Sequence, residues 1–196
     1  MTPVTFVIPV KALDRAKGRL AAVLSPEARR ELVLDMLSRV LASAADSTAD
    51  ALLVVTSDAE ARAAALAYGA EVLGDPENEL NASVLAGFER CWTGGRIPLY
   101  LPADLPHIDT TTVDALLSAA REGNIVIAPA HDGGTNALLV PPSAPLAPRL
   151  GARSFDRHLA EAKRLGYETQ VYRARALELD VDTPADLEAA RSLTHP

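Results

Sequence analysis

The chain has 196 residues, 48% of them hydrophobic and 23% charged, so it is long enough to bury a core as one domain and too apolar to be disordered. Its excess of acidic side chains gives a net charge of −7, which argues against nucleic acid as the main partner, because duplex binding depends on neutralising phosphates. One cysteine, Cys91, excludes an internal disulfide and a cysteine-based zinc site and favours a reducing compartment, and hence a cytoplasmic location.

The first segment, MTPVTFVIPV, has no basic region and no long apolar stretch. We therefore expect neither a signal peptide nor a membrane span. Its apolar run at 4–10 predicts a strand that is covered on both faces. A polar loop follows, and Pro26 then opens a helix with Ser25 as its N-cap.

Strand and helix patterns alternate as far as residue 130. Short apolar runs predict further strands at 51–57, at 70–74, within 97–106, where the strand runs into a proline-rich turn, and at 124–130. Apolar residues three and four apart predict the helices between them, and Asp58 is placed to cap the first of these. Such alternation predicts a parallel sheet with helices on both faces, joined by right-handed crossovers.

The pattern loosens after residue 130, where Gly and Pro surround one short strand at 137–140. A helix at 154–165 follows, and the segments 167–174 and 177–182 resemble strands. The last helix begins at Thr183 and Pro184, with Asp186 completing a partial capping box. We expect a single domain over residues 1–196, an α/β fold of αβα-sandwich type with a mostly parallel sheet.

Three aspartates lie just past predicted strands or near the end of one. Asp104 sits in the turn PADLP between two prolines, and Asp180 and Asp182 are two apart, so they face the same way on a strand. Each alone is equally typical of a turn, an exposed strand position or a helix start. Ligands of open α/β sheets bind at the carboxyl ends of strands, so together the three predict a site for Mg²⁺ or Mn²⁺, bridging to a nucleotide.

Basic side chains crowd the loop after the first strand, at Lys11, Arg15, Lys17 and Arg19. A solvated surface loop would look the same, but at this end of a sheet Lys and Arg are the usual partners of phosphate. The loop matches neither the Walker pattern nor GxGxxG. This argues against a P-loop ATPase and a standard dehydrogenase.

The stretches DGGTNAL and RLGARSF predict a second anion site. Glycines let backbone amides approach an anion, and a helix start adds donors, although an ordinary turn and an ordinary N-cap would use the same residues. His131 and His158 fall near it, but the chain has no HExxH or Ser-His-Asp pattern, which argues against a nucleophilic serine. The donors expected at this site are Gly133, Gly134, Thr135, Asn136, Gly151 and Ser154, with Arg149 and Arg153 close by.

Five ordered stretches, which together cover nearly the whole chain, carry a family resemblance: IPVKALDRAKGRL, LPADLP, DGGTNALL, GARSFDRHLAEA and LDVDTPADL. With these stretches the chain resembles the guanylyltransferase family of deazaflavin coenzyme F-420 biosynthesis. The resemblance implies a nucleotidyltransferase fold, related to the nucleotide-diphospho-sugar transferases. It also implies an enzyme that transfers GMP from GTP to a small phosphorylated acid with Mg²⁺ or Mn²⁺.

The resemblance assigns roles motif by motif. The metal ligands would be Asp104, Asp180 and Asp182. The acid would be held by Thr135, Gly151 and Ser154. The GTP phosphates would meet Lys11, Lys17 and Arg19, with Asp104, Lys17 and Lys11 as the catalytic residues and Asn81 near the base or ribose. Two positions depart from the family pattern, which often has Ser in place of Gly18 and a small residue in place of Arg153.

The acids used within this family are phosphoenolpyruvate, 2-phospho-L-lactate and 3-phosphoglycerate. A composition rich in Ala, Arg, Leu and Val suggests a high-GC bacterium and therefore phosphoenolpyruvate, with enolpyruvoyl-2-diphospho-5'-guanosine and pyrophosphate as products. More distant alternatives are a metal-dependent glycosyltransferase, which also uses paired aspartates, and a non-catalytic nucleotide-binding module. We expect a monomer or homodimer with no nucleic-acid or membrane partner.

Overall fold

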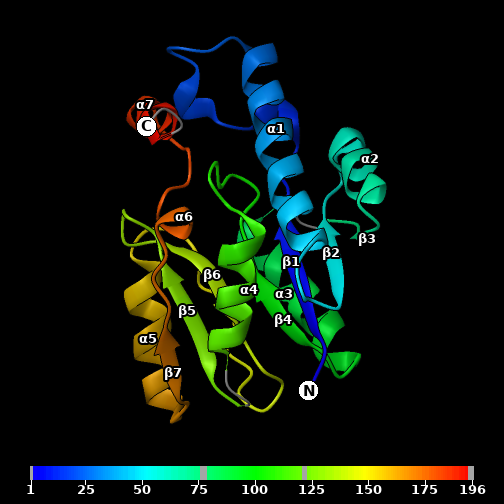
Figure 1. The fold of residues 1–196 in the computed structure, drawn as a ribbon, viewed down its shortest axis with the longest axis vertical. Coiled ribbons are helices and arrows are strands. Elements are labelled where there is room, and N and C mark those ends of the chain that lie inside the picture. Colours follow the sequence, from blue (N-terminus) through cyan, green and yellow to red (C-terminus); the bar gives the residue numbers. More distant parts are fainter. Residues whose placement is uncertain (1, 76–78, 121–122, 194–196) are drawn as a thin grey trace.

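The strands form a single mixed sheet of seven in the computed structural model, which describes residues 2–75, 79–120 and 123–193 (Figure 1). Their order across the sheet is β3-β2-β1-β4-β6-β5-β7. Neighbouring strands are parallel except for β6, which runs antiparallel to both β4 and β5. The expected, mostly parallel sheet is therefore confirmed. The strands are β1 (Val4–Pro9), β2 (Ala51–Val55), β3 (Glu71–Leu73), β4 (Ile97–Tyr100), β5 (Ile125–Pro129), β6 (Thr135–Leu139) and β7 (Thr169–Val171).

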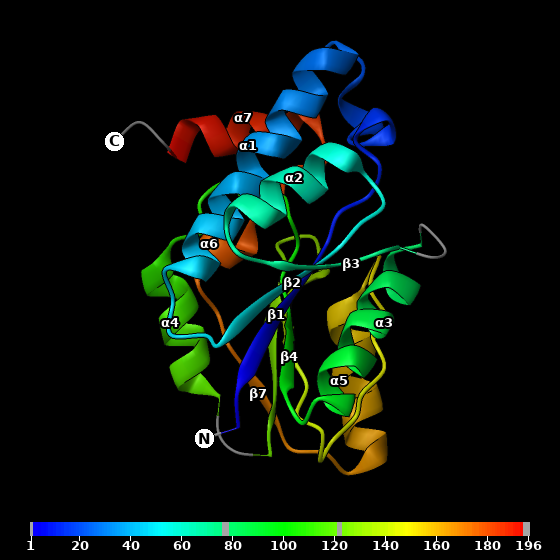
Figure 2. The same ribbon diagram turned by 90° about the vertical axis from the view of Figure 1, so that its right-hand side faces the viewer.

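Helices cover both faces of this sheet, as the alternation of the sequence predicts (Figure 2). Phe6 and Ile8 of β1 point to one face and Val7 points to the other, so that two separate apolar layers form. The first layer packs against α1 (Pro26–Ala45), α2 (Ala59–Ala67), α4 (Thr110–Ala119) and α6 (Arg175–Glu178). The second packs against α3 (Leu80–Thr93) and α5 (Ser154–Leu165).

The predicted helix starts are confirmed by their caps. Ser25 Oγ accepts the amide of Ala28 at 3.2 Å, with Pro26 as the first residue of α1. The Asp58 carboxylate accepts amides of the first turn of α2. At the last helix, α7 (Pro184–Leu193), Thr183 and Asp186 bond each other's backbone amides reciprocally, which is a complete capping box.

The prediction of a strand at 177–182 is wrong. The short strand expected at 137–140 forms but starts earlier, at Thr135. Leu177 and Glu178 belong to the short helix α6, and 179–182 runs on without joining the sheet. The reason is that β7 already occupies the place beside β5 at the edge of the sheet. The segment 179–182 instead crosses above the ends of the strands, where Val181 N donates to Asp104 O at 3.2 Å.

The C-terminal helix α7 closes this end of the molecule (Figure 1). Val181 and Leu187 pack with Leu20 and Met36 in a third, smaller apolar cluster between α7, α1 and the loop after β1. That loop, expected as irregular, contains two 3-10 turns, η1 (Leu13–Arg15) and η2 (Gly18–Leu20). In the described part of the chain, no helix combines the length and apolar character needed to cross a membrane.

Candidate active site

A cleft of about 720 Å³ opens at the carboxyl ends of the strands. It lies beside β1, whose sheet neighbours are β2 on one side and β4 on the other, so the strand order reverses here. Ligands of open α/β sheets bind at such a reversal, and the loop after β1, the PADLP turn and the segment with Asp180 and Asp182 all contribute to the lining. The predicted residues that line this cleft are Lys11, Arg15, Lys17, Arg19, Asp104, Gly134, Thr135, Asn136, Gly151, Ser154, Asp180 and Asp182.

The three aspartates meet at one end of the cleft. Each of Asp104, Asp180 and Asp182 offers an oxygen, and these oxygens lie within 4.8 Å of one another. Asp104 follows β4, whereas the other two flank Val181, which is 1% exposed. Burial of Val181 between them turns both carboxylates to the same side, as in a strand, although no strand forms here.

These carboxylates fit a divalent cation. Within the described residues, Asp104 Oδ1 is a buried oxygen without a hydrogen-bond partner. Burial raises the pKa of Asp180 above its ordinary value, and the neighbouring charges of Asp104 and Asp182 raise it further, while the amide of Asn136 opposes them. Such crowding of ionised oxygens is relieved by a positive charge, and hard oxygen donors suit ions of the Mg²⁺ type.

In this structure Lys17 supplies that positive charge. Its ammonium group contacts Asp104 and lies 2.7 Å from Asp182 Oδ1. Burial lowers the pKa of Lys17, but the two carboxylates outweigh that effect and hold the pKa above its ordinary value. The backbone of Lys17 adopts the left-handed conformation, with φ of 52°, as the chain enters η2. Lys17 thus lies among the acidic side chains, and its contact with GTP phosphates stays a prediction.

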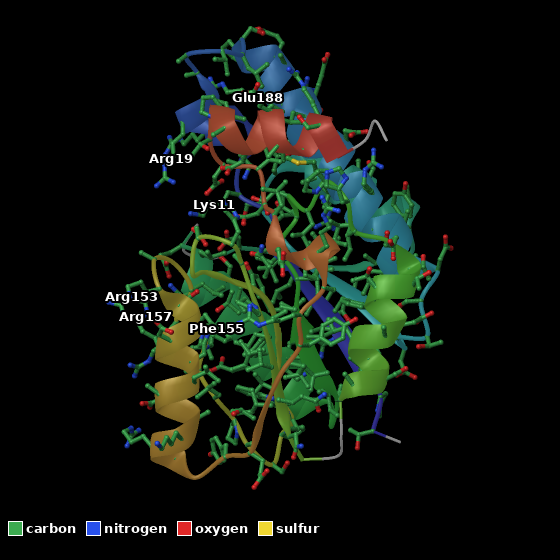
Figure 3. The ribbon with its side chains drawn as sticks, turned by 60° about the vertical axis from the view of Figure 1, so that its left-hand side comes forward. Lys11, Arg19, Arg153, Phe155, Arg157 and Glu188 are labelled. Carbon is green, nitrogen blue, oxygen red and sulfur yellow. The ribbon has the colours of Figure 1, made fainter. Side chains whose placement is uncertain are left out.

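The other two cations that are predicted to meet the GTP phosphates, Arg19 and Lys11, lie at the opening of the cleft. Arg19 is largely exposed, with a guanidinium nitrogen 3.9 Å from Asp182 Oδ2. Lys11 is also exposed and lines the cleft. Figure 3 shows both near α7, with Arg153 and Arg157 on the same side of the molecule at the start of α5. Long exposed cations around a cleft favour the entry of an anionic ligand.

Tyr100 is a cleft residue that sequence reasoning missed. It ends β4, two residues before the PADLP turn, and is 4% exposed. Burial raises the pKa of its phenol well above the usual value, and the three aspartates add to this. The phenol therefore stays protonated. Its place at the end of a strand before Asp104 was the available signal.

The other end of the cleft holds the predicted acid-binding residues. Thr135 is the first residue of β6 and Ser154 the first of α5, and their hydroxyl oxygens are 3.0 Å apart. Gly151 lies beside them with φ of +113°, a conformation open to glycine and strained for other residues. The structure thus brings all three together in the cleft that contains the aspartates.

The backbone amides expected to bind an anion here are already used. Gly133 N donates to Ala130 O at 3.2 Å, and Gly134 N donates to Asp132 Oδ1 at 2.7 Å. Both hydrogens of the Asn136 side-chain amide are also taken, by Leu177 O and Asp180 Oδ1. In this structure the turn and the nearby loop satisfy these three groups internally, and their donation to a ligand stays a prediction.

Three further predicted residues lie beside the cleft and do not line it in the described structure. Asn81 exchanges two hydrogen bonds with the backbone of Leu150, which does line the cleft. Its predicted contact with the nucleotide is not tested by this geometry. Arg149 and Arg153 point largely to solvent, and Arg153 pairs with Asp156 at 3.2 Å.

Comparison with known proteins identifies the family. Residues 4–190 match the family described as guanylyl transferase CofC like. A phosphoenolpyruvate guanylyltransferase of Sphaerobacter thermophilus is 41% identical over 185 residues, covering 93% of this chain and 89% of the relative. A 2-phospho-L-lactate guanylyltransferase of Methanothermobacter thermautotrophicus is 36% identical over 182 residues, covering 92% of this chain and 81% of the relative.

Solved structures agree on the fold. A nucleotidyl transferase from Methanothermobacter thermautotrophicus superposes with a TM-score of 0.70 at 18% sequence identity, covering 97% of both chains. At that sequence identity, the similarity shows only that the two proteins share a fold. The expected nucleotidyltransferase-type fold is confirmed.

Proposed function

Because this chain belongs to the CofC-like guanylyl transferase family, whose named members are enzymes, we propose that it transfers GMP from GTP to the phosphate of phosphoenolpyruvate. The products would be enolpyruvoyl-2-diphospho-5'-guanosine and pyrophosphate. The choice of acid is supported by the relative from Sphaerobacter, which is more similar than the one named for 2-phospho-L-lactate. We place the reaction in deazaflavin coenzyme F-420 biosynthesis and in the cytoplasm.

The chemistry needs charge neutralisation more than proton transfer. A phosphate monoester has a second pKa of about 6, so the acid is already a dianion near neutral pH and can attack without a general base. One of its phosphate oxygens bonds to the α-phosphorus of GTP as the bond from that phosphorus to the bridging oxygen breaks, and pyrophosphate leaves. The obstacle is the repulsion between two anions.

The residues of the cleft suit that task. Asp104, Asp180 and Asp182 would hold Mg²⁺, and Lys11, Lys17 and Arg19 would meet the triphosphate. When bound, the metal would supply neutralisation of phosphate charge as pyrophosphate departs. Thr135, Gly151 and Ser154 would orient the acid.

One observation supports the proposal that the metal site and the acid site serve the same reaction. Thr135 and Asn136 are consecutive residues of β6, at an irregularity in its pairing with β5, and their side chains bond to helices on opposite faces of the sheet, α5 and α6. Thr135 turns toward Ser154 of α5, and Asn136 donates to Asp180 Oδ1 at 3.1 Å. The proposed acid site and the proposed metal site are therefore joined by a single peptide bond, which suits an attack of one bound anion on another.

The test is an assay with GTP, Mg²⁺ and each of the three family acids in turn, following release of pyrophosphate. Turnover with phosphoenolpyruvate above the other two would support the proposal. Preference for 2-phospho-L-lactate or 3-phosphoglycerate would keep the reaction and change the acid. Turnover of a nucleotide sugar without pyrophosphate would instead indicate a glycosyltransferase, and GTP binding without any turnover a nucleotide-binding module.

The substitution Asp104→Asn tests the proposed metal site separately from the stability of the fold. It removes a charge from the cluster while keeping the size of the side chain, so we expect turnover to fall roughly 100-fold or more with little change in melting temperature. Asp35→Asn, an exposed aspartate of α1, is the matched control and should keep full activity. Full activity of Asp104→Asn would count against the metal assignment.

A further inference from the structure

His158 lies behind the hydroxyl pair at the acid end of the cleft. It is a residue of α5 that is 0% exposed, and its Nδ1 lies 3.0 Å from Thr135 Oγ1. Its other ring nitrogen, Nε2, lies 2.9 Å from the backbone nitrogen of Arg149. Both ring nitrogens of this buried imidazole are therefore engaged.

The contact with Arg149 decides which nitrogen carries the proton. A backbone N–H can only donate, so Nε2 must accept through its lone pair. A neutral imidazole then carries its hydrogen on Nδ1, and that N–H donates to Thr135 Oγ1. Protonation of Nε2 would set two N–H groups against each other.

The charge state of His158 agrees with this arrangement. Burial lowers its pKa to about 4, with smaller contributions from the cations Arg157 and Arg149. At neutral pH the ring is thus uncharged and keeps the Nε2 lone pair. Its role toward Thr135 is that of a fixed donor.

A count of the hydroxyl hydrogens of Thr135 and Ser154 shows how many remain to donate to a ligand. Thr135 and Ser154 each bring one O–H, and a single hydrogen bond joins their oxygens. His158 donates to Thr135 and accepts nothing from it. One hydroxyl hydrogen is therefore left over, and both residues line the cleft.

Four backbone amides at this end of the cleft are already satisfied. Ser154 N donates to Gly151 O at 3.0 Å, and Phe155 N donates to Gly133 O at 3.2 Å. The amides of Gly133 and Gly134 are used within their own turn. Of these groups, the surplus hydroxyl hydrogen is the donor that stays available to a ligand.

We propose that His158 is a positioning residue for the acid substrate: by donating to Thr135, it turns the surplus hydroxyl hydrogen of the Thr135–Ser154 pair into the cleft, toward an anionic oxygen. This inference rests on the proposed function only for the identity of the acid. The chemical class that it selects is an acceptor without hydrogens of its own, a carboxylate or a phosphate oxygen. A neutral hydroxyl or amino group at the same place would gain less binding free energy from this hydrogen bond.

Two substitutions test this. His158→Leu keeps an apolar volume and removes both ring nitrogens. His158→Gln places an amide nitrogen and an amide oxygen about 2.2 Å apart, close to the spacing of the two ring nitrogens, so it can donate to Thr135 and accept from Arg149. We expect His158→Leu to raise the KM for phosphoenolpyruvate roughly tenfold, the worth of one hydrogen bond to a charged group, with the KM for GTP changed less than about twofold. His158→Gln should recover most of the loss.

A measurement without turnover accompanies the kinetics. The ¹⁵N shifts of the imidazole, assigned by the signals that His158→Gln removes, should show a protonated Nδ1 and a bare Nε2 near neutral pH. A ring protonated at Nε2 would overturn the proposal. So would a His158→Leu enzyme in which both KM values rise together with a fall in melting temperature, since that is the signature of a purely structural histidine.

Failure of the proposed function is distinguishable from failure of this inference. If the wild-type enzyme turns over none of the acids with GTP, the function is wrong, and binding of phosphoenolpyruvate and of inorganic phosphate is then compared by calorimetry in wild type and His158→Leu. Weaker binding of either anion to the variant supports the positioning role. Equal binding overturns it.

Discussion

Lys17 Nζ lies 2.7 Å from Asp182 Oδ1, two atoms that belong to residues 165 positions apart. The same ammonium contacts Asp104, which follows β4. The lysine side chain is 9% exposed and the Asp182 side chain is 48% exposed, so the ammonium group is largely shielded from solvent and the carboxylate is not. A metal ion bound by these carboxylates would compete with the lysine, and Lys17 would then be free to turn toward the triphosphate.

Replacement of Lys17 by Met should reveal this competition. Without the ammonium, we expect Mn²⁺ to bind at least about fivefold more tightly in the absence of nucleotide, because no cation has to be displaced. The metal-free protein should lose about 1–2 kcal/mol of unfolding free energy, because its partly exposed carboxylates lose their partner. Calorimetric Mn²⁺ titration and denaturation in chelator measure the two effects.

Lys11→Met is the control for that experiment. Lys11 lines the same cleft but is exposed, so its removal should leave metal-free stability unchanged. An unaltered Mn²⁺ affinity in Lys17→Met would show that the lysine and the metal do not share the carboxylates.

Asp186 anchors the metal-site segment from the start of α7. Its Oδ2 accepts from Asp182 N at 3.1 Å, from Thr183 N at 2.7 Å and from Thr183 Oγ1 at 2.8 Å. Asp186→Ala should cost roughly 1–2 kcal/mol of stability, the usual worth of a cap, and weaken Mn²⁺ binding about tenfold by loosening Asp182. Glu188→Ala, an exposed residue of the same helix labelled in Figure 3, should do neither. Loss of stability with unchanged metal affinity would reduce Asp186 to a helix cap.

The stability of the protein should depend on pH through His158. Its folded pKa of about 4 lies below the unfolded value of 6.5, so the folded state favours the neutral ring. This contribution is fully present above pH 6.5 and is lost as the pH falls toward 4, at most roughly 3 kcal/mol from the size of the shift. Urea denaturation at intervals across that window should show wild type losing more stability than His158→Gln. Parallel losses in the two proteins would contradict the assignment.

Gly87 lets α3 approach the sheet closely. A Cβ at this position would lie 2.4 Å from Val7 Cγ1 of β1. Helix propensity alone favours Ala over Gly by about 1 kcal/mol, but overpacking costs about 1–3 kcal/mol, so we expect Gly87→Ala to destabilise the protein. Gly74→Ala, where a Cβ meets nothing within 4 Å, is the control. Denaturant midpoints decide the sign, and a stabilised Gly87→Ala would show that the helix shifts outward at little cost.

Much of the fold and the place of the site could be predicted from the sequence. Apolar runs, helical stripes and helix caps each depend on a few neighbouring residues, so they can be recognised in the sequence. The predicted caps at Ser25, Asp58 and Thr183 all form. Parallel strands joined by helices bring their carboxyl ends to one edge, which is why Asp104 and the loop after β1 could be placed in one cleft.

Only the tertiary structure decided how the polar groups are shared. The sequence pattern at 177–182 favours a strand, but β7 occupies the edge beside β5, and a short helix and a crossing segment result. The Gly133 and Gly134 amides donate within their own turn. Lys17 is bonded to carboxylates far along the chain, and Thr135 accepts a hydrogen bond from His158, 23 residues away. Local sequence determines which donors and acceptors exist. Their pairing depends on which of them the packed core brings within about 3 Å, and no short window of sequence contains that information.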